Sequence, residues 1–110
     1  MSDLKPTTDA TFAVDVLQSA KPVIVDFTAE WCGPCKGLKP VLRDLANEYG
    51  EEIAFVAVDA DSNPELCKQY EIRSLPTLMF FQGGEMRERM HPGRRSEMSQ
   101  QIERLLGAGA

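Results

Sequence analysis

The sequence predicts an α/β protein in which a mixed central β-sheet is flanked by helices on both faces. Short apolar runs rich in β-branched residues alternate with segments whose apolar residues recur every three or four positions. Near the end of the chain, Gly83-Gly84 separates two strand-like runs, which is typical of an antiparallel hairpin. The resulting element order is βαβαβαββα. At 110 residues, the chain is expected to form a single domain, 1–110, with a core that needs no disulfide staples.

Each element has its own signal in the sequence. Strands are expected at 3–7, 22–28, 53–58, 78–81 and 85–90, and helices at 12–20, 32–49, 64–70 and 96–106. Pro6 restricts the first strand to an edge, since proline donates no hydrogen bond to a ladder. Thr11 and Asn63 are expected to cap the helices that follow them, and Pro40 to kink the long helix. Strands joined through helices are expected to run parallel, with the last hairpin adding an antiparallel edge.

Composition limits the classes of partner and the location. The chain carries 12 Lys and Arg against 17 Asp and Glu, a net charge of −5, so neither nucleic acid nor an anionic membrane would attract it. No apolar run approaches the roughly 20 residues of a membrane span. The N-terminus shows no basic segment followed by an apolar stretch, so no signal peptide is expected. We therefore expect a cytoplasmic protein.

The most informative stretch is Trp31-Cys32-Gly33-Pro34-Cys35-Lys36, in which two cysteines are spaced CxxC. It falls on the turn between an apolar strand and the long helix. The first N–H groups of a helix have no intrahelical partner, and the positive end of its dipole favours an anion, so a thiolate at Cys32 should be stabilised. Two cysteines at this spacing can close into a disulfide. The stretch therefore predicts redox chemistry.

A metal site is the alternative for this cysteine pair. Cys67 and the lone His91 would have to complete a Cys₃His set. Zinc sites of this kind usually show a second pair of closely spaced ligands, whereas these two candidates are single and scattered. We therefore predict no metal site. Cys67 is predicted to have a packing or incidental role in a helix rather than to form a third redox centre, and His91 to be structural or incidental.

The motif WCGPCK after a strand, Asp26 within that strand, and the later run Ile72-Arg73-Ser74-Leu75-Pro76-Thr77 together resemble the thioredoxin family of the bacterial type. The likeness extends from about Phe12 to Leu106. A bare CxxC would be weak support, because zinc sites and ferredoxin-like clusters share it. The preceding Trp, the internal Gly-Pro and the later loop proline make the resemblance specific. It implies the thioredoxin fold, with the mixed sheet described above.

The resemblance implies a thiol-disulfide oxidoreductase that reduces protein disulfides, with Cys32 and Cys35 as its redox disulfide. Cys32 is expected to be the exposed nucleophile and Cys35, one turn deeper, to resolve the mixed disulfide. By resemblance, Asp26 takes and returns the proton of Cys35. No cofactor would be bound, and electrons would come from NADPH through a thioredoxin reductase. Implied targets include ribonucleotide reductase, peroxiredoxin and methionine sulfoxide reductase, within electron transport and cell redox homeostasis. We expect a monomer.

Asp26 also stands out from the residues alone. A carboxylic acid in the apolar run 22–27 is costly to bury unless it is hydrogen-bonded or neutral. An Asp at a strand end turned to solvent is the alternative. Because the strand leads directly into the CxxC turn, the carboxyl is expected beneath the motif. Ala57 departs from the family pattern, which often has a lysine on the neighbouring strand. Without that cation, we expect a more strongly raised pKa for Asp26.

Pro76 resembles the cis-proline of the family, although a trans proline at the start of a strand is the alternative. A cis bond would let Leu75 present its backbone to an extended substrate. The resemblance implies a flat apolar docking surface around the dithiol, formed by Trp31, Gly33, Pro34, Ser74, Leu75, Pro76 and Gly93. Two departures are expected to shift partner preference: Thr28, where the family often has an aromatic residue, and the charges of Arg94-Arg95.

A second class of function remains open from the sequence. A binding module could use the docking surface within a larger assembly, with redox turnover secondary. Serine at either motif cysteine would abolish catalysis and spare such a role, so this substitution separates the two classes.

Overall fold

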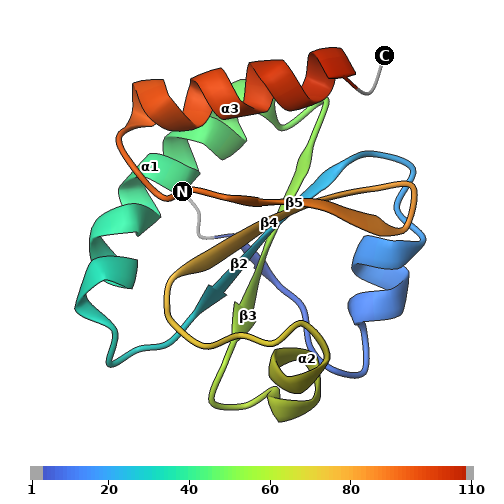
Figure 1. The fold of residues 1–110 in the computed structure, drawn as a ribbon, viewed down its shortest axis with the longest axis vertical. Coiled ribbons are helices and arrows are strands. Elements are labelled where there is room, and N and C mark those ends of the chain that lie inside the picture. Colours follow the sequence, from blue (N-terminus) through green and yellow to red (C-terminus); the bar gives the residue numbers. More distant parts are fainter. Residues whose placement is uncertain (1–3, 109–110) are drawn as a thin grey trace.

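The computed structural model describes residues 4–108 and confirms the predicted order of elements. The strands are β1 (Lys5–Pro6), β2 (Val23–Thr28), β3 (Ala54–Asp59), β4 (Thr77–Gln82) and β5 (Glu85–Met90). The helices are the π-helix η1 (Ala13–Leu17), α1 (Gly33–Tyr49), α2 (Pro64–Gln69) and α3 (Arg95–Ala108). The sheet lies between α1 and α3 on one side and η1 and α2 on the other (Figure 1). Of the strand expected at 3–7, only two residues form, and residue 3 lies outside the described residues.

The sheet has five strands in the order β1-β3-β2-β4-β5. As expected, β1, β3 and β2 run parallel. The expectation is wrong for β4, which follows α2 but lies antiparallel to β2. A helix of six residues, as α2 is, spans about 9 Å, less than half the length of a strand of six residues. The chain therefore enters β4 from the end of the sheet at which it left β3.

Strand β2 has a core on each side, which explains its nearly unbroken apolar run. Val23 and Phe27 belong to the core beside η1 and α2, and Ile24 belongs to the core beside α1 and α3. Side chains alternate along a strand, so Asp26 and Thr28 lie on the same face as Ile24. The two polar residues of β2 thus face α1, the helix that carries the cysteine motif.

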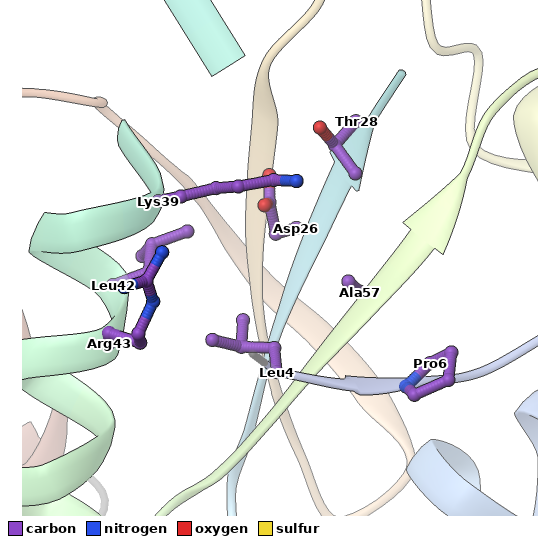
Figure 2. Close-up of a pocket in the computed structure, with 8 residues that line it drawn as sticks. All are labelled: Leu4, Pro6, Asp26, Thr28, Lys39, Leu42, Arg43 and Ala57. Carbon is purple, nitrogen blue, oxygen red and sulfur yellow. The ribbon is translucent and has the colours of Figure 1, made fainter. Parts of the chain in front are cut away.

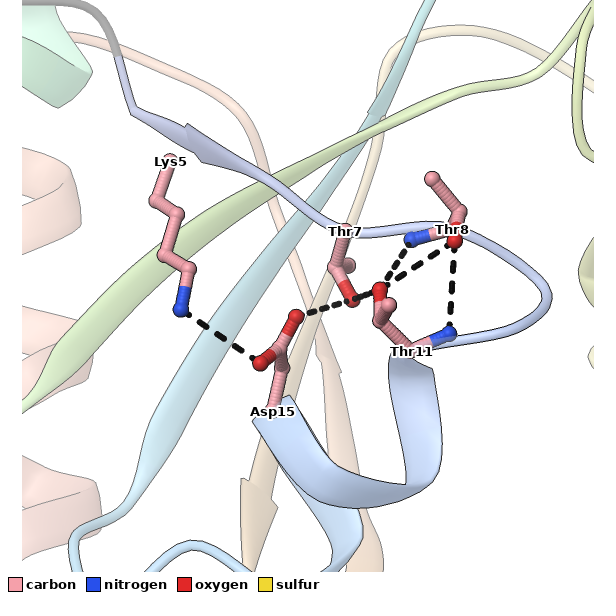
Figure 3. A network of polar contacts seen from close by, with 5 residues as sticks. All are labelled: Lys5, Thr7, Thr8, Thr11 and Asp15. Carbon is pink, nitrogen blue, oxygen red and sulfur yellow. Dashed lines mark hydrogen bonds and ion pairs between the residues drawn. The ribbon is translucent and has the colours of Figure 1, made fainter.

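The cap expected at Thr11 is wrong, because the N-cap of η1 is Phe12, which makes no side-chain cap bond. The Thr11 N–H donates to the carbonyl of Thr8, and its hydroxyl accepts from the Thr8 N–H. The buried Thr7 hydroxyl donates to Asp15 Oδ2 at 2.9 Å, and Lys5 pairs with Oδ1 (Figure 3). The bond from Thr7, helped by Lys5, lowers the pKa of the Asp15 carboxyl. This network ties η1 to β1.

Helix α2 is capped by a residue from the start of the chain. Asn63 occupies the N-cap position as predicted, but its side chain makes no cap bond. Its amide accepts from the Asp9 N–H at 2.8 Å and donates to the Asp59 carbonyl at 2.9 Å. Asp9 instead accepts from the N–H groups of Glu65 and Leu66, at 3.3 and 3.0 Å. The loop before η1 and the start of α2 therefore hold each other in place.

Helix α3 fixes the far end of α1. The Tyr49 hydroxyl, in the last turn of α1, donates to Glu103 Oε2 at 2.7 Å and lies 2.8 Å from the Ser99 hydroxyl. Arg95 at the start of α3 pairs with Glu48. Helix α1 continues through Pro40 to Tyr49. These contacts hold α1 against the sheet, with its first turn at the end of β2.

The predicted hairpin joins β4 and β5 and forms one edge of the sheet. Gly83 and Gly84 adopt φ values of 63° and 80°, which favour glycine. A side chain at Gly84 would also approach the Leu17 carbonyl, since a Cβ there would lie 3.0 Å from its oxygen. Glycine is thus required both by the turn and by the proximity of η1.

Candidate active site

The structure joins Cys32 and Cys35 in a disulfide at the start of α1, with their Cα atoms 5.3 Å apart. Cys32 is the N-cap residue, and its Sγ accepts a hydrogen bond from the Cys35 N–H at 3.2 Å. Pro34 lies in the first turn, where a missing N–H breaks no helical bond. The Cys32 sulfur therefore occupies the position at which helix N–H groups and the helix dipole stabilise a thiolate.

Cys32 is buried, which corrects the expectation of an exposed nucleophile. It is 4% exposed and Cys35 is 1% exposed, so Cys35 is the deeper residue by a small margin. The two cysteines form a small buried cluster with Ala29, and Leu75 packs against this cluster. Access to the disulfide is therefore shaped by the loops on either side of it.

Trp31 forms an exposed flank of the disulfide. Its side chain is held at one point, because the indole Nε1 donates to Asp61 Oδ2 at 2.8 Å, while the residue remains 70% exposed. Gly33 and Ser74 are also exposed. The Ser74 carbonyl accepts a 2.6 Å bond from the Thr77 hydroxyl, which braces the loop before β4.

The peptide bond between Leu75 and Pro76 is cis, as expected. Beside it, a shallow and mainly apolar groove runs from the loop before β4 to the first two turns of α1. It brings together three of the predicted docking residues, Pro34, Pro76 and Gly93, with four that the sequence did not single out for docking, Gly37, Leu38, Val41 and Pro92. Trp31, Gly33, Ser74 and Leu75 lie outside this groove. The predicted surface is therefore a groove with separate flanking residues rather than one flat patch.

The positive charges expected beside Gly93 are both paired. Arg94 forms an ion pair with Glu97, and Arg95 forms one with Glu48. The side chain of Glu97 also lies over Gly93, where an added Cβ would come within 2.6 Å of its carboxylate. The local charge next to the groove is therefore more balanced than the pair of arginines alone predicts.

Asp26 is buried on the side of β2 that lies against α1, and is not a strand-end residue turned to solvent. It is 3% exposed, and its Oδ1 has no hydrogen-bond partner among residues 4–108. Burial raises the pKa of the carboxyl from its ordinary value of 3.8 to about 7. The side chain can therefore change protonation state near neutral pH.

A cation does act on Asp26, although the neighbouring strand carries Ala57. Lys39 of α1 reaches toward the carboxyl, and its charge opposes the rise of the Asp26 pKa (Figure 2). Lys39 is thus a cation near Asp26 that the sequence did not reveal. The rise itself remains, because the desolvation caused by burial is larger than the attraction to Lys39.

Cys67 and His91 take no part in a metal cluster. Within residues 4–108, no three or more His, Cys, Asp and Glu side chains are arranged to hold a metal ion. Cys67 is a free, half-buried cysteine whose thiol faces the Ala60 carbonyl, and burial raises its pKa. The backbone of His91 exchanges two hydrogen bonds with the side chain of Gln101. A packing or incidental role for Cys67 and a structural or incidental role for His91 stay predictions.

Comparison with known proteins assigns the family. The family model described as Thioredoxin matches residues 3–104. The chain belongs to the thioredoxin family. With a disulfide in the CxxC motif, this thioredoxin-family protein is a thiol-disulfide oxidoreductase whose redox-active pair is Cys32 and Cys35.

Curated thioredoxins align with most of the chain. Thioredoxin 1 of Synechococcus elongatus is 48% identical over 85 residues, which cover 77% of this chain and 79% of that protein. Thioredoxin of Mycobacterium tuberculosis is 49% identical over 78 residues, 71% of this chain and 67% of that protein. A bifunctional thioredoxin reductase/thioredoxin of Mycobacterium leprae is also 49% identical over 78 residues, which make up only 17% of that longer protein. No helix within residues 4–108 is long and apolar enough to cross a membrane.

The sequence reasoning missed Lys39 as a neighbour of Asp26. A signal was present, because Cys35, Lys39 and Leu42 are spaced four and three residues apart and so share one face of α1. Cys35 and Leu42 are buried on that face. Lys39 itself is exposed, but its spacing places it on the same face of α1 as these two buried residues.

Proposed function

We propose that this protein reduces disulfides in other proteins and that Cys32, Cys35 and Asp26 carry the reaction. The observation that supports this most directly is the Cys32–Cys35 disulfide at the N-terminus of α1, a helix that lines both an apolar groove and the cavity beside the buried Asp26 carboxyl. The groove offers a binding surface for a target chain. The carboxyl offers a proton acceptor with a pKa near neutral pH.

Reduction of a target proceeds by two thiol-disulfide exchanges. In the reduced protein, the Cys32 thiolate attacks one sulfur of the target disulfide, forms a mixed disulfide and releases the first target thiolate. Cys35 then attacks Cys32 Sγ, which closes the Cys32–Cys35 disulfide and releases the second target thiolate. Two electrons pass to the target, and each released thiolate takes a proton from solvent.

Asp26 serves the second exchange. Cys35 is buried, so its thiol needs a base within the protein before it can attack as a thiolate. Asp26 accepts that proton in its ionised form and returns one when the disulfide is reduced again. A pKa of about 7 suits both directions, since each protonation state is well populated at neutral pH.

Target binding uses the groove and the residues that flank it. Pro34, Pro76 and Gly93 contact the target from the groove, while Trp31, Gly33 and Ser74 bound the site. The cis bond before Pro76 lets Leu75 offer its backbone to an extended segment of the target.

The electrons come from NADPH through a thioredoxin reductase, and the protein itself binds no cofactor. One relative, in Mycobacterium leprae, is named as a fusion of these two activities, which supports a reductase as partner. The targets are disulfide proteins of the ribonucleotide reductase, peroxiredoxin or methionine sulfoxide reductase kind. We infer that residues 1–110 act as one domain, as a monomer, in the cytoplasm, in electron transport and redox homeostasis.

Turnover of a protein disulfide tests this proposal. The parent protein, supplied with NADPH and a thioredoxin reductase, is expected to reduce a generic protein disulfide catalytically, and Cys32→Ser is expected to abolish turnover. Dithiothreitol in place of the reductase distinguishes a failure of the reductase partnership from a failure of the disulfide chemistry. A parent protein inactive with both electron sources would contradict the proposal and favour a binding module.

A further inference from the structure

The apolar groove beside the disulfide continues along α1 into a second, polar hollow. Pro34, Gly37 and Val41 line the groove, and Asp44 and Glu48 line the hollow. These five residues are spaced three or four apart, so they share one face of the helix. The groove and the hollow therefore lie end to end and form one trough, which begins beside the disulfide and ends in the last turn of α1.

The opposite wall of the trough follows the same course. Pro92 and Gly93 line the groove, and Arg95, the first residue of α3, lines the hollow. The segment that joins β5 to α3 thus runs beside α1 (Figure 1). Because both walls advance together from the apolar end to the polar end, an extended chain that lies in the groove would be guided into the hollow.

The polar hollow offers a carboxylate to a bound chain. Glu48 is already paired with Arg95 across the hollow. Asp44 is exposed and is not part of any ion pair within residues 4–108. Asn47 adds an exposed amide. A cationic side chain of a bound partner can therefore pair with Asp44 without displacing an existing ion pair.

The cations of α1 lie away from this trough. Lys39 and Arg43 line the cavity between α1 and the strands β1, β2 and β3 (Figure 2). Lys36, the third cation of the helix, lines neither the groove nor the hollow. All residues of α1 are described by the structure, and those that give polar side chains to the trough are two acids and one asparagine. A chain bound there would thus meet negative rather than positive charge from this helix.

The length of the trough sets the spacing of the contacts along a target. Asp44 follows Cys32 by twelve residues, which corresponds to about 18 Å along a helix that rises 1.5 Å per residue. An extended segment advances about 3.3 Å per residue, so roughly five of its residues cover this distance. A target that forms its mixed disulfide with Cys32 would therefore bring a side chain about five residues away to Asp44.

We propose that an extended segment of the target lies in this trough and that Asp44 favours targets with a lysine or arginine about five residues from the cysteine that reacts. The proposal rests on the proposed function, because the exchange at Cys32 fixes one end of the segment. Apolar side chains between the two points pack in the groove. The pair with Asp44 is exposed and adds little affinity, so its effect is to select among targets.

Reduction of short peptides tests this charge preference. Each substrate is a peptide with one cysteine, joined to a second copy by a disulfide, and carries Lys, Gln or Glu five residues before or after the cysteine. Dithiothreitol supplies the electrons. In one of the two orientations, the lysine peptide is expected to have a KM about two- to fivefold lower than the glutamine peptide, as an exposed ion pair allows, and the glutamate peptide a higher one. The same KM for all three charges in both orientations would overturn the proposal.

Variants at Asp44 assign the preference to the trough. Asp44→Asn is expected to remove the difference between the lysine and glutamine peptides, and Asp44→Lys to favour the glutamate peptide. Glu65→Gln is the matched control, because it removes the same charge from an exposed position of α2, on the other side of the sheet. It is expected to keep the preference of the parent. An equal loss in Asp44→Asn and Glu65→Gln would mean that net charge, rather than the trough, selects the peptide.

Gly37 tests the path between the two ends. It is exposed, and a Cβ added there would have no heavy atom within 4 Å, so a side chain can be introduced without a clash. Gly37→Gln is expected to raise the KM of the lysine peptide severalfold more than that of a small aromatic disulfide, which is too short to lie along the trough. Equal effects on both substrates would show that the peptide does not follow α1.

The same assays keep the two levels of proposal apart. A parent protein that reduces neither the peptides nor the small aromatic disulfide would refute the proposed function. A parent protein that reduces all of them, but without regard to the charge of the peptide, would refute only the selection of targets by Asp44.

Discussion

The two faces of the sheet differ in the kinds of side chain that they bury. On the face covered by η1 and α2, the apolar side chains of the core are joined by three aromatic rings, Phe12, Tyr70 and Phe81, with centroids 5.5–5.6 Å apart. On the face covered by α1, the same strand β2 carries the buried Asp26 and the half-buried Thr28 beside a cavity. Both faces bury an apolar core, but only the face of α1 also holds a buried titratable group, which lowers stability where it ionises.

This comparison shows how a small domain can hold an unsatisfied carboxyl. Stabilities of single domains are commonly about 5–15 kcal/mol, so an ionised group in the core is a large burden. The loss of stability is limited here because the buried carboxyl lies on only one side of β2. Val23, Val25 and Phe27 on the other side are fully buried in an apolar core.

The largest effect is expected from cysteine substitutions on the two sides of the sheet. Cys35→Ser leaves Cys32 without its resolving partner, so turnover should fall to the uncatalysed background while stable mixed disulfides with target proteins accumulate through Cys32. Cys67→Ser, in α2 on the other side, should keep full turnover and trap nothing. Mass spectrometry of the trapped adducts identifies the attacking sulfur. Adducts on Cys67 in the Cys35→Ser protein would mean that the attacking cysteine has been misassigned.

A second, smaller effect separates the two faces within β2 itself. A folded pKa of about 7 means that, below the ordinary value of 3.8, Asp26 is protonated in both states and costs nothing extra. As pH rises from 3.8 towards 7, Asp26 ionises in the unfolded chain but stays largely protonated in the folded chain, so the free energy of unfolding falls. Asp26→Asn is therefore expected to be more stable than the parent at pH 8, by up to about 4 kcal/mol, and by under about 1 kcal/mol at pH 4. Turnover should slow by on the order of a hundredfold.

Val25→Ala is the matched control for this experiment. Val25 is the neighbour of Asp26 in β2 but is fully buried on the opposite face. Its truncation should cost roughly 2 kcal/mol at every pH, with turnover retained. Denaturation curves at pH 4 and pH 8 distinguish the two variants. A stability difference for Asp26→Asn that does not change with pH would show that the carboxyl ionises as freely in the folded state as in the unfolded one.

The smallest expected effect is spectroscopic. Trp31 is the single tryptophan of the chain and adjoins Cys32, so its fluorescence should increase when the neighbouring disulfide is reduced. Emission spectra with and without reductant measure this change. Cys35→Ser, which cannot close the disulfide, should show no response to reductant. If the spectra of the parent were the same in both states, the pair would not be cycling between thiol and disulfide.

Local patterns predicted most elements, and contacts between distant residues account for the errors. The CxxC helix, the Gly83-Gly84 hairpin and the order of the strands along the chain follow from periodicity and turn residues. The cap of α2 could not be found in this way, because it comes from Asp9, more than 50 residues before the helix. The direction of β4 likewise depends on where α2 ends in space rather than on its sequence.

The candidate site shows the same division. The cysteines, Asp26 and the cis bond before Pro76 were all expected, because each lies in a motif with a fixed spacing. The contribution of Lys39 depends on the path of a long side chain across a space left open by Ala57, which is 18 residues away in sequence. Residue spacing alone can place Lys39 on the correct face of α1. It cannot show that the space beside Ala57 is open to the lysine side chain.

The edges of the sheet bear on how such a protein survives contact with its targets. A chain that handles extended segments of other proteins risks pairing with them along any free strand and forming aggregates. Here β1 has only two residues, one of them Pro6, which donates no ladder hydrogen bond. At the opposite edge, β5 presents the exposed charges of Glu85, Arg87 and Arg89. Both outer strands therefore discourage unintended β-pairing, so they would not compete with the loop before β4, the proposed place of attachment for extended targets.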